Sequence, residues 1–133
     1  MNTVAQTYTE LSLEGVSPVG LVVALYDNAL RSLHRARRAI EANDIEARIK
    51  HLNHVQNIIA HLQGTLDLEN GGEVAKTMMR FYNYARGKVL EASLSNSKEK
   101  ITELAAHFST LREAWQMVDA QVYNGPNSPS GHA

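Results

Sequence analysis

Three histidines are the residues of this chain whose type and spacing suggest chemistry. His51, His54 and His61 lie in a stretch with helical periodicity, and at 100° per residue the side chains of His54 and His61 fall within about 20° of each other. A metal ion would need further ligands converging on these imidazoles. The same face holds Lys50 and Asn57 and no carboxylate one turn away. We therefore expect no metal site, and we expect His54 and His61 to be exposed and without a ligand.

Other catalytic chemistries lack their residues. The absence of cysteine excludes disulfides, thiolate metal sites and cysteine nucleophiles. A di-iron centre in a helical bundle needs Glu-x-x-His on two helices, and the sequence contains none. It also has no Gly-rich phosphate loop and no Gly-x-Ser-x-Gly motif. We expect a protein that is not an enzyme, with no catalytic residues and no cofactor.

A histidine phosphotransfer bundle remains an alternative because it has the same fold. The phospho-accepting histidine of such a domain is followed closely by Lys and Gly. The segment from His61 to Gly64 (HLQG) lacks the lysine, and so do the segments after the other histidines considered. A helical bundle that binds only itself is the other alternative, and the sequence leaves both open.

The charge balance argues against nucleic acid and membrane partners. The chain has 13 Lys and Arg against 14 Asp and Glu, a net charge of -1, so nothing draws it to a polyanion. No apolar run approaches the ~20 residues that span a bilayer. The first residues have neither a basic start nor an apolar core, so they do not resemble a signal peptide. We expect a cytoplasmic protein that is not inserted in a membrane.

Four stretches of the sequence have helical periodicity, and the histidines discussed above lie within them. Ser17 before Pro18, Asp44 and Ser97 are the expected N-caps, and Asn70-Gly71-Gly72 is a helix breaker. The expected helices run from about 18 to 42, 45 to 66, 73 to 94 and 98 to 122. Short connections between amphipathic helices of similar length predict an all-α, antiparallel up-down four-helix bundle.

Each predicted helix has one apolar stripe, and the stripes predict the core. Trp115 lies near the centre of the last stripe, so we expect it to be buried. The predicted core residues are Val22, Leu25, Ala29, Leu33, Ala36 and Ile40; Ile45, Leu52, Val55, Ile59, Leu62 and Leu66; Val74, Met78, Phe81, Tyr82, Ala85, Val89 and Ala92; and Ile101, Leu104, Phe108, Leu111, Trp115, Val118 and Val122.

The two ends of the chain differ from the bundle, which we expect over residues 17–122. Residues 1–16 are too short for a bundle helix but hold Tyr8, Leu11, Leu13 and Val16, so we expect an N-terminal cap segment lying across the bundle. Residues 123–133 are rich in Gly, Pro, Asn and Ser, which predicts a disordered tail.

Several apolar residues lie outside the core stripes. They either widen the helix contacts or form shallow apolar grooves in which a partner's amphipathic helix docks. These residues are Val23, Tyr26, Leu30, Ile58, Met79 and Leu90.

Four strings, in order along the chain, resemble one protein family. The strings are Ser17 to Leu30 (SPVGLVVALYDNAL), residues 55–67 (VQNIIAHLQGTLD), Phe81 to Tyr84 (FYNY) and Leu111 to Trp115 (LREAW). They are similar to the successive helices of flagellar export chaperones of the FliS family. Tyr8 stands where that family carries an N-terminal tyrosine. The similarity extends over about residues 8–118.

This resemblance implies a function. The protein would bind the disordered C-terminal segment of flagellin, prevent its premature polymerisation and deliver it to the flagellar export gate. The cap segment would be displaced by flagellin, remain as permanent core, or contact flagellin directly through Tyr8. The candidate partner-binding residues are Tyr8, Leu11, Leu13, Val23, Tyr26, Leu30, Ile58, Met79 and Leu90.

Overall fold

Four helices make up the fold, as expected. The structure is a computed structural model that describes residues 15 and 17–124, with side chains as far as Val118. The helices are α2 (Pro18–Glu41), α3 (Ile45–Gly64), α4 (Gly72–Ser95) and α5 (Lys98–Asn124). They have 24, 20, 24 and 27 residues, well over half of the chain. No strand occurs in the described part, so the all-α prediction is confirmed.

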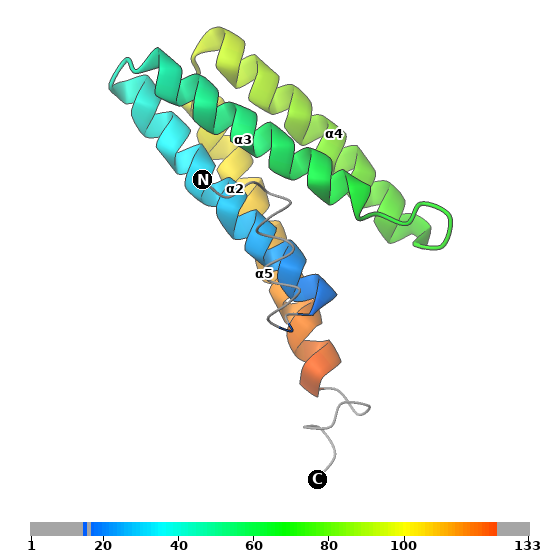
Figure 1. Ribbon diagram of the computed structural model, residues 1–133. Helices are drawn as coiled ribbons and strands as arrows, with labels where there is room; N and C mark the ends of the chain where they lie inside the picture. The colour runs from blue at the N-terminus through cyan, green and yellow to red at the C-terminus, as the bar shows by residue number, and fades with distance from the viewer. Residues whose placement is uncertain (1–14, 16, 125–133) are drawn as a thin grey trace.

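The helices pack in a ring. α2 contacts α3 and α5, and α4 also contacts α3 and α5. Figure 1 shows each helix running opposite to the one before it, so the up-down bundle is confirmed. The α3–α4 pair diverges from the α2–α5 pair, and the α3–α4 turn lies well apart from the C-terminal end of α5.

The predicted N-caps fix where three helices begin. The Ser17 hydroxyl accepts the backbone N–H of Gly20 at 2.9 Å, and the Asp44 carboxylate accepts that of Ala47 at 3.1 Å. The Ser97 hydroxyl accepts the N–H three residues further on at 3.2 Å. Each bond satisfies one of the amides that the first turn leaves unpaired.

The turn before α4 uses a carboxylate and a close backbone approach. Asp67 accepts the backbone N–H groups of Glu69 and Asn70 at 3.2 and 3.0 Å. A Cβ at Gly71 would lie 2.4 Å from the Asp67 carbonyl oxygen, and Gly72 has a φ of +63°. Glycine at these two positions therefore permits the turn.

An aromatic centre joins three of the four helices. Tyr26 of α2, Tyr82 of α4 and Phe108 of α5 are buried, and we call them the aromatic centre. The rings of Tyr26 and Phe108 are 5.1 Å apart in an edge-to-face arrangement. The Tyr26 and Tyr82 hydroxyls share a hydrogen bond of 2.8 Å, which gives each buried polar group a partner.

Some predicted core residues are not buried. Ile45 and Val74 are 62% and 64% exposed, because each lies in the first turn of its helix, where few neighbours cover it. Val118 is exposed near the end of α5. Trp115 is only partly buried against the core, and its indole N–H donates to the Tyr26 hydroxyl at 3.4 Å. Trp115 was expected to be buried, and it is only partly so.

The predicted chain ends fall mostly outside the described residues. α5 continues to Asn124, two residues beyond its expected end. The cap segment, with Tyr8, Leu11, Leu13 and Val16, and the tail from residue 125 lie outside the part that the structure describes.

Candidate functional site

The outer side of the α3–α4 pair has a polar middle. The Gln56 side chain donates to the Arg86 carbonyl at 3.0 Å, and the Gln63 side chain donates to Asn83 at 2.7 Å. The Gln63 amide is also 3.3 Å from the sulfur of Met79. Met79 is a predicted partner-binding residue. It is partly buried, and the Gln63 side chain contacts its sulfur.

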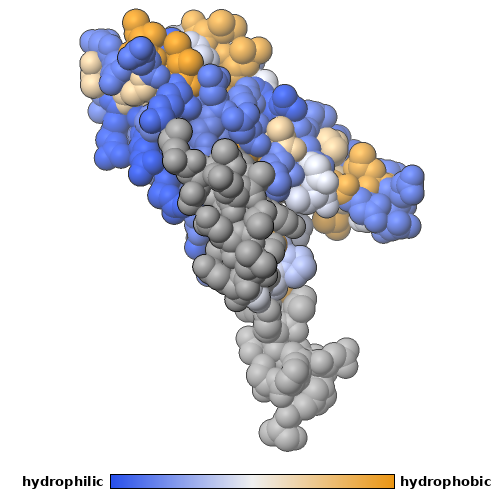
Figure 2. Space-filling view, viewed as in Figure 1, coloured by the Kyte–Doolittle hydropathy of each residue, from blue (hydrophilic) through white to orange (hydrophobic). Residues whose placement is uncertain are grey.

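The same outer side is apolar at the end where α3 begins and α4 ends. Ile45, Ile49, Leu90 and Leu94 are 62%, 43%, 56% and 81% exposed, and we call these four residues the apolar crest. The side chain of Arg48 donates to Asn96, which brings the first turns of α3 to the last turn of α4. Figure 2 shows hydrophobic residues gathered at this end of the molecule.

Only Leu90 of the crest was identified from the sequence. Ile45 was assigned to the core, and Ile49 and Leu94 were missed. The available signal was the i, i+4 spacing of Ile45 with Ile49 and of Leu90 with Leu94, which places each pair on one side of its helix.

A shallow groove lies between α2 and α5. It has a volume of about 310 Å³ and includes Leu30, another predicted partner-binding residue. Its floor is apolar and its edge polar, where Arg37 donates to the Thr102 hydroxyl at 3.2 Å. The lining residues are Leu30, His34, Arg37, Ile101, Thr102, Ala105, Ala106 and Ser109.

The other candidate residues are distributed between the core and the undescribed segment. Tyr26 and Ile58 are completely buried, so neither is available on the surface of this structure. Val23 of α2 is partly buried. Tyr8, Leu11 and Leu13 lie outside the described residues.

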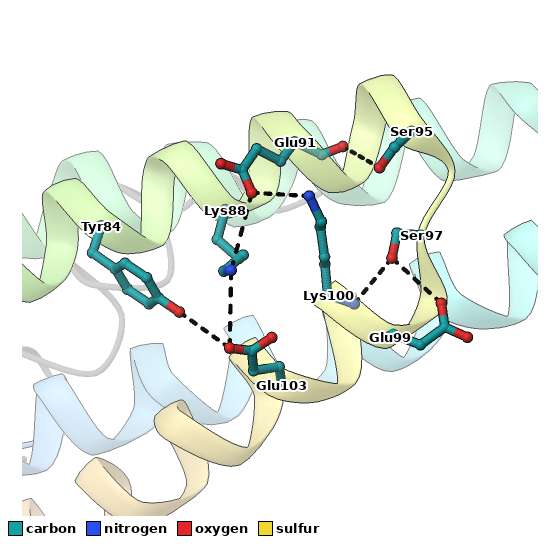
Figure 3. A network of polar contacts seen from close by, with 8 residues as sticks. All are labelled: Tyr84, Lys88, Glu91, Ser95, Ser97, Glu99, Lys100 and Glu103. Carbon is teal, nitrogen blue, oxygen red and sulfur yellow. Dashed lines mark hydrogen bonds and ion pairs between the residues drawn. The ribbon is translucent and has the colours of Figure 1, made fainter.

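Ion pairs hold α4 against α5 beside the crest (Figure 3). Lys100 Nζ lies 3.1 Å from the Glu91 carboxylate, and Lys88 Nζ lies 3.9 Å from that of Glu103. The hydrogen bond from Lys100 lowers the pKa of Glu91. The Lys88 ammonium also lies 5.4 Å from the centre of the Tyr84 ring. The Glu91 and Glu103 side chains are more than half exposed, so each pair contributes little stability singly.

The histidines belong to no metal-binding cluster in the described residues. His54 and His61 are partly buried rather than exposed as expected. Burial, followed by the charge of Arg35, lowers the pKa of His54. Within residues 15 and 17–124, no three His, Cys, Asp or Glu side chains lie close enough to hold a metal ion. No helix there is both long and apolar enough to cross a bilayer.

Comparison with known proteins gives a consistent result. The sequence model of the family described as "Flagellar protein FliS" matches residues 1–122. The chain is 35% identical over 119 residues to the flagellar secretion chaperone FliS of Salmonella typhimurium, covering 89% of this chain and 88% of that protein. It is 36% identical over 102 residues to the protein of the same name from Campylobacter jejuni, covering 77% and 80%. The Bacillus subtilis FliS is 28% identical over 109 residues, covering 82% and 80%.

Proposed function

The chain belongs to the FliS family of flagellar secretion chaperones, and on that premise we propose that it binds the C-terminal segment of flagellin in the cytoplasm. The family's role is not enzymatic. Bound in this way, flagellin is prevented from polymerising prematurely and is delivered to the flagellar export apparatus. The export gate then receives the chaperone and flagellin as a complex.

The apolar surface outside the core is the observation that supports this proposal. The crest exposes four large aliphatic side chains, and the α2–α5 groove adds the partly buried Leu30. Amphipathic helices bind to other proteins by laying their apolar faces into surfaces of this kind. The two regions lie on different sides of the bundle, so one long client segment reaches both only by wrapping around it.

A wrapping interface suits a disordered client. A segment that folds on binding loses conformational entropy, which costs about 2–5 kcal/mol or more of the interaction energy. A large apolar interface offsets that cost and still leaves moderate affinity. Moderate affinity is what export needs, because the client must leave the chaperone at the gate.

Two exposed leucines provide a direct test. We expect Leu90→Glu combined with Leu94→Glu to weaken flagellin binding by about tenfold or more, ~1.4 kcal/mol, as measured by calorimetry with monomeric flagellin. Asn53→Glu with Asn57→Glu is the matched control, because these exposed α3 residues have the same spacing. Removing the C-terminal segment of flagellin abolishes binding if the proposal is correct. A complex that survives this truncation on size exclusion contradicts it.

The N-terminal residues have a proposed role in the same process. We propose that the apolar segment with Tyr8, Leu11 and Leu13 occupies part of the client surface and is displaced by flagellin. Deleting residues 1–14 then leaves flagellin affinity equal or higher, while the free protein aggregates more readily. A parallel fall in melting temperature and affinity indicates permanent packing instead. Loss of binding by Tyr8→Ala at unchanged melting temperature indicates direct contact.

A further inference from the structure

One face of α2 is unusually cationic. Arg31, Arg35 and Arg38 are exposed, and their i, i+4, i+7 spacing places them along one side of the helix over about 10.5 Å. We call these three residues the arginine face. They line a shallow hollow of about 390 Å³ together with His34 and Arg37. No carboxylate contributes to this hollow.

Among the described residues, the arginine face lacks the acidic partners that Arg112 and Arg37 have. Arg112 is paired with Asp27 across α2 and α5, and Arg37 lies 3.9 Å from Glu41. In the described residues, by contrast, the arginine face forms no ion pair, and Arg31 donates only to the neutral amide of Asn28. Since the whole chain has a net charge of -1, this is a local concentration of positive charge.

The arginine face acts electrostatically on two histidines of α3. The positive charge of Arg35 acts on His51 and His54, lowering the pKa of each after the larger effect of burial. Lys50 also acts on His51, and Asp44 is the acidic group that opposes them. The lowered pKa values keep both imidazoles neutral near pH 7, so they add no positive charge, and Lys50 is the cation that α3 contributes near the arginine face.

We propose that the arginine face docks an acidic helical segment of a protein partner. Its hollow adjoins the α2–α5 groove assigned to flagellin and shares His34 and Arg37 with it, but the three arginines themselves do not line that groove. A guanidinium binds a carboxylate through two parallel hydrogen bonds. A partner helix with carboxylates at i, i+4 and i+7 presents them at the same spacing as the three arginines. The arginine face carries no Phe, Tyr or Trp on which bases stack, and the chain as a whole is negative, so a nucleic acid fits less well.

A designed peptide tests the proposal with the full-length protein. The probe is a fluorescent helical peptide with glutamates at i, i+4 and i+7, and its partner control has glutamines there. Binding is followed by anisotropy at about 0.1 M and about 1 M salt, between which the Debye length falls from ~10 to ~3 Å. The test variant combines Arg31→Gln, Arg35→Gln and Arg38→Gln. The control variant removes the same number of positive charges from other exposed positions, through Lys76→Gln, Arg80→Gln and Lys98→Gln.

The expected result is that only the arginine-face variant loses binding of the glutamate peptide, by about tenfold, and that salt weakens the wild-type complex. Flagellin affinity stays unchanged in that variant, so this test fails or succeeds independently of the proposed function. Equal loss in both variants overturns the proposal, as does absence of peptide binding. Tighter binding of an oligothymidylate indicates a nucleic acid instead, and self-association abolished by the same substitutions indicates a second copy of the chain.

Discussion

The aromatic centre and the apolar crest are both apolar but have opposite exposure. Tyr26, Tyr82 and Phe108 are buried where α2, α4 and α5 meet. Leu90 and Leu94 lie on the same helix as Tyr82 and are largely exposed. The difference teaches that the phase of an apolar residue on its helix sets the direction of its side chain, whereas the neighbouring helices decide whether anything covers it.

The largest expected difference between the two regions is in stability. Phe108→Ala removes a buried ring, and we expect it to lower the free energy of unfolding by about 3–5 kcal/mol. Leu94→Ala removes a side chain that is 81% exposed, so we expect a change within about 0.5 kcal/mol. Urea denaturation followed by circular dichroism measures both. Similar values for the two variants would break the comparison.

The hydroxyls of the aromatic centre provide a second test. Tyr26→Phe leaves the Tyr82 hydroxyl buried without its 2.8 Å partner, so we expect a loss of about 1–3 kcal/mol. Burial raises the pKa of both phenols, so they remain neutral donors and acceptors. The double variant with Tyr82→Phe should cost less than the sum of the single changes. Strict additivity in denaturation experiments would show that the hydrogen bond contributes nothing.

A third test addresses the crest through its backbone. Asp44 caps α3 immediately before Ile45, so we expect Asp44→Ala to cost about 1 kcal/mol. The effect should be local, because the cap satisfies only the first turn. Hydrogen exchange should show faster opening at residues 45–49 and little change around Phe108. Uniform loss of protection along the chain would contradict a local role.

The smallest expected effect is on the pH dependence of stability. The folded protein lowers the pKa of His51 and His54 below the usual value near 6.5, so the unfolded chain binds protons first. The free energy of unfolding should therefore fall as pH decreases through 6.5 toward the folded pKa values. His51→Gln with His54→Gln should flatten this slope in thermal melts between about pH 7.5 and pH 5. An unchanged slope would show that other titrating groups cause the pH dependence of stability.

Local sequence determined the helices and their boundaries. Ser17 with Pro18, Asp44 and Ser97 begin helices where they were expected to, because capping depends on a side chain and an amide three residues away. The apolar spacing also identified most of the core, including Tyr82 and Phe108. The family was recognisable because several short strings occur in the right order along these helices.

Tertiary structure decided what is buried and what is available to a partner. Ile45 lies on an apolar stripe but is exposed at a helix end, while Tyr26, at the edge of its stripe, is completely buried. The Asp27–Arg112 pair joins residues 85 positions apart. Helical periodicity is set within a few residues. Burial of a side chain and ion pairing between helices depend on helices that meet only after the chain folds. For this reason the sequence predicted Leu90 as a partner-binding residue and missed the rest of the crest.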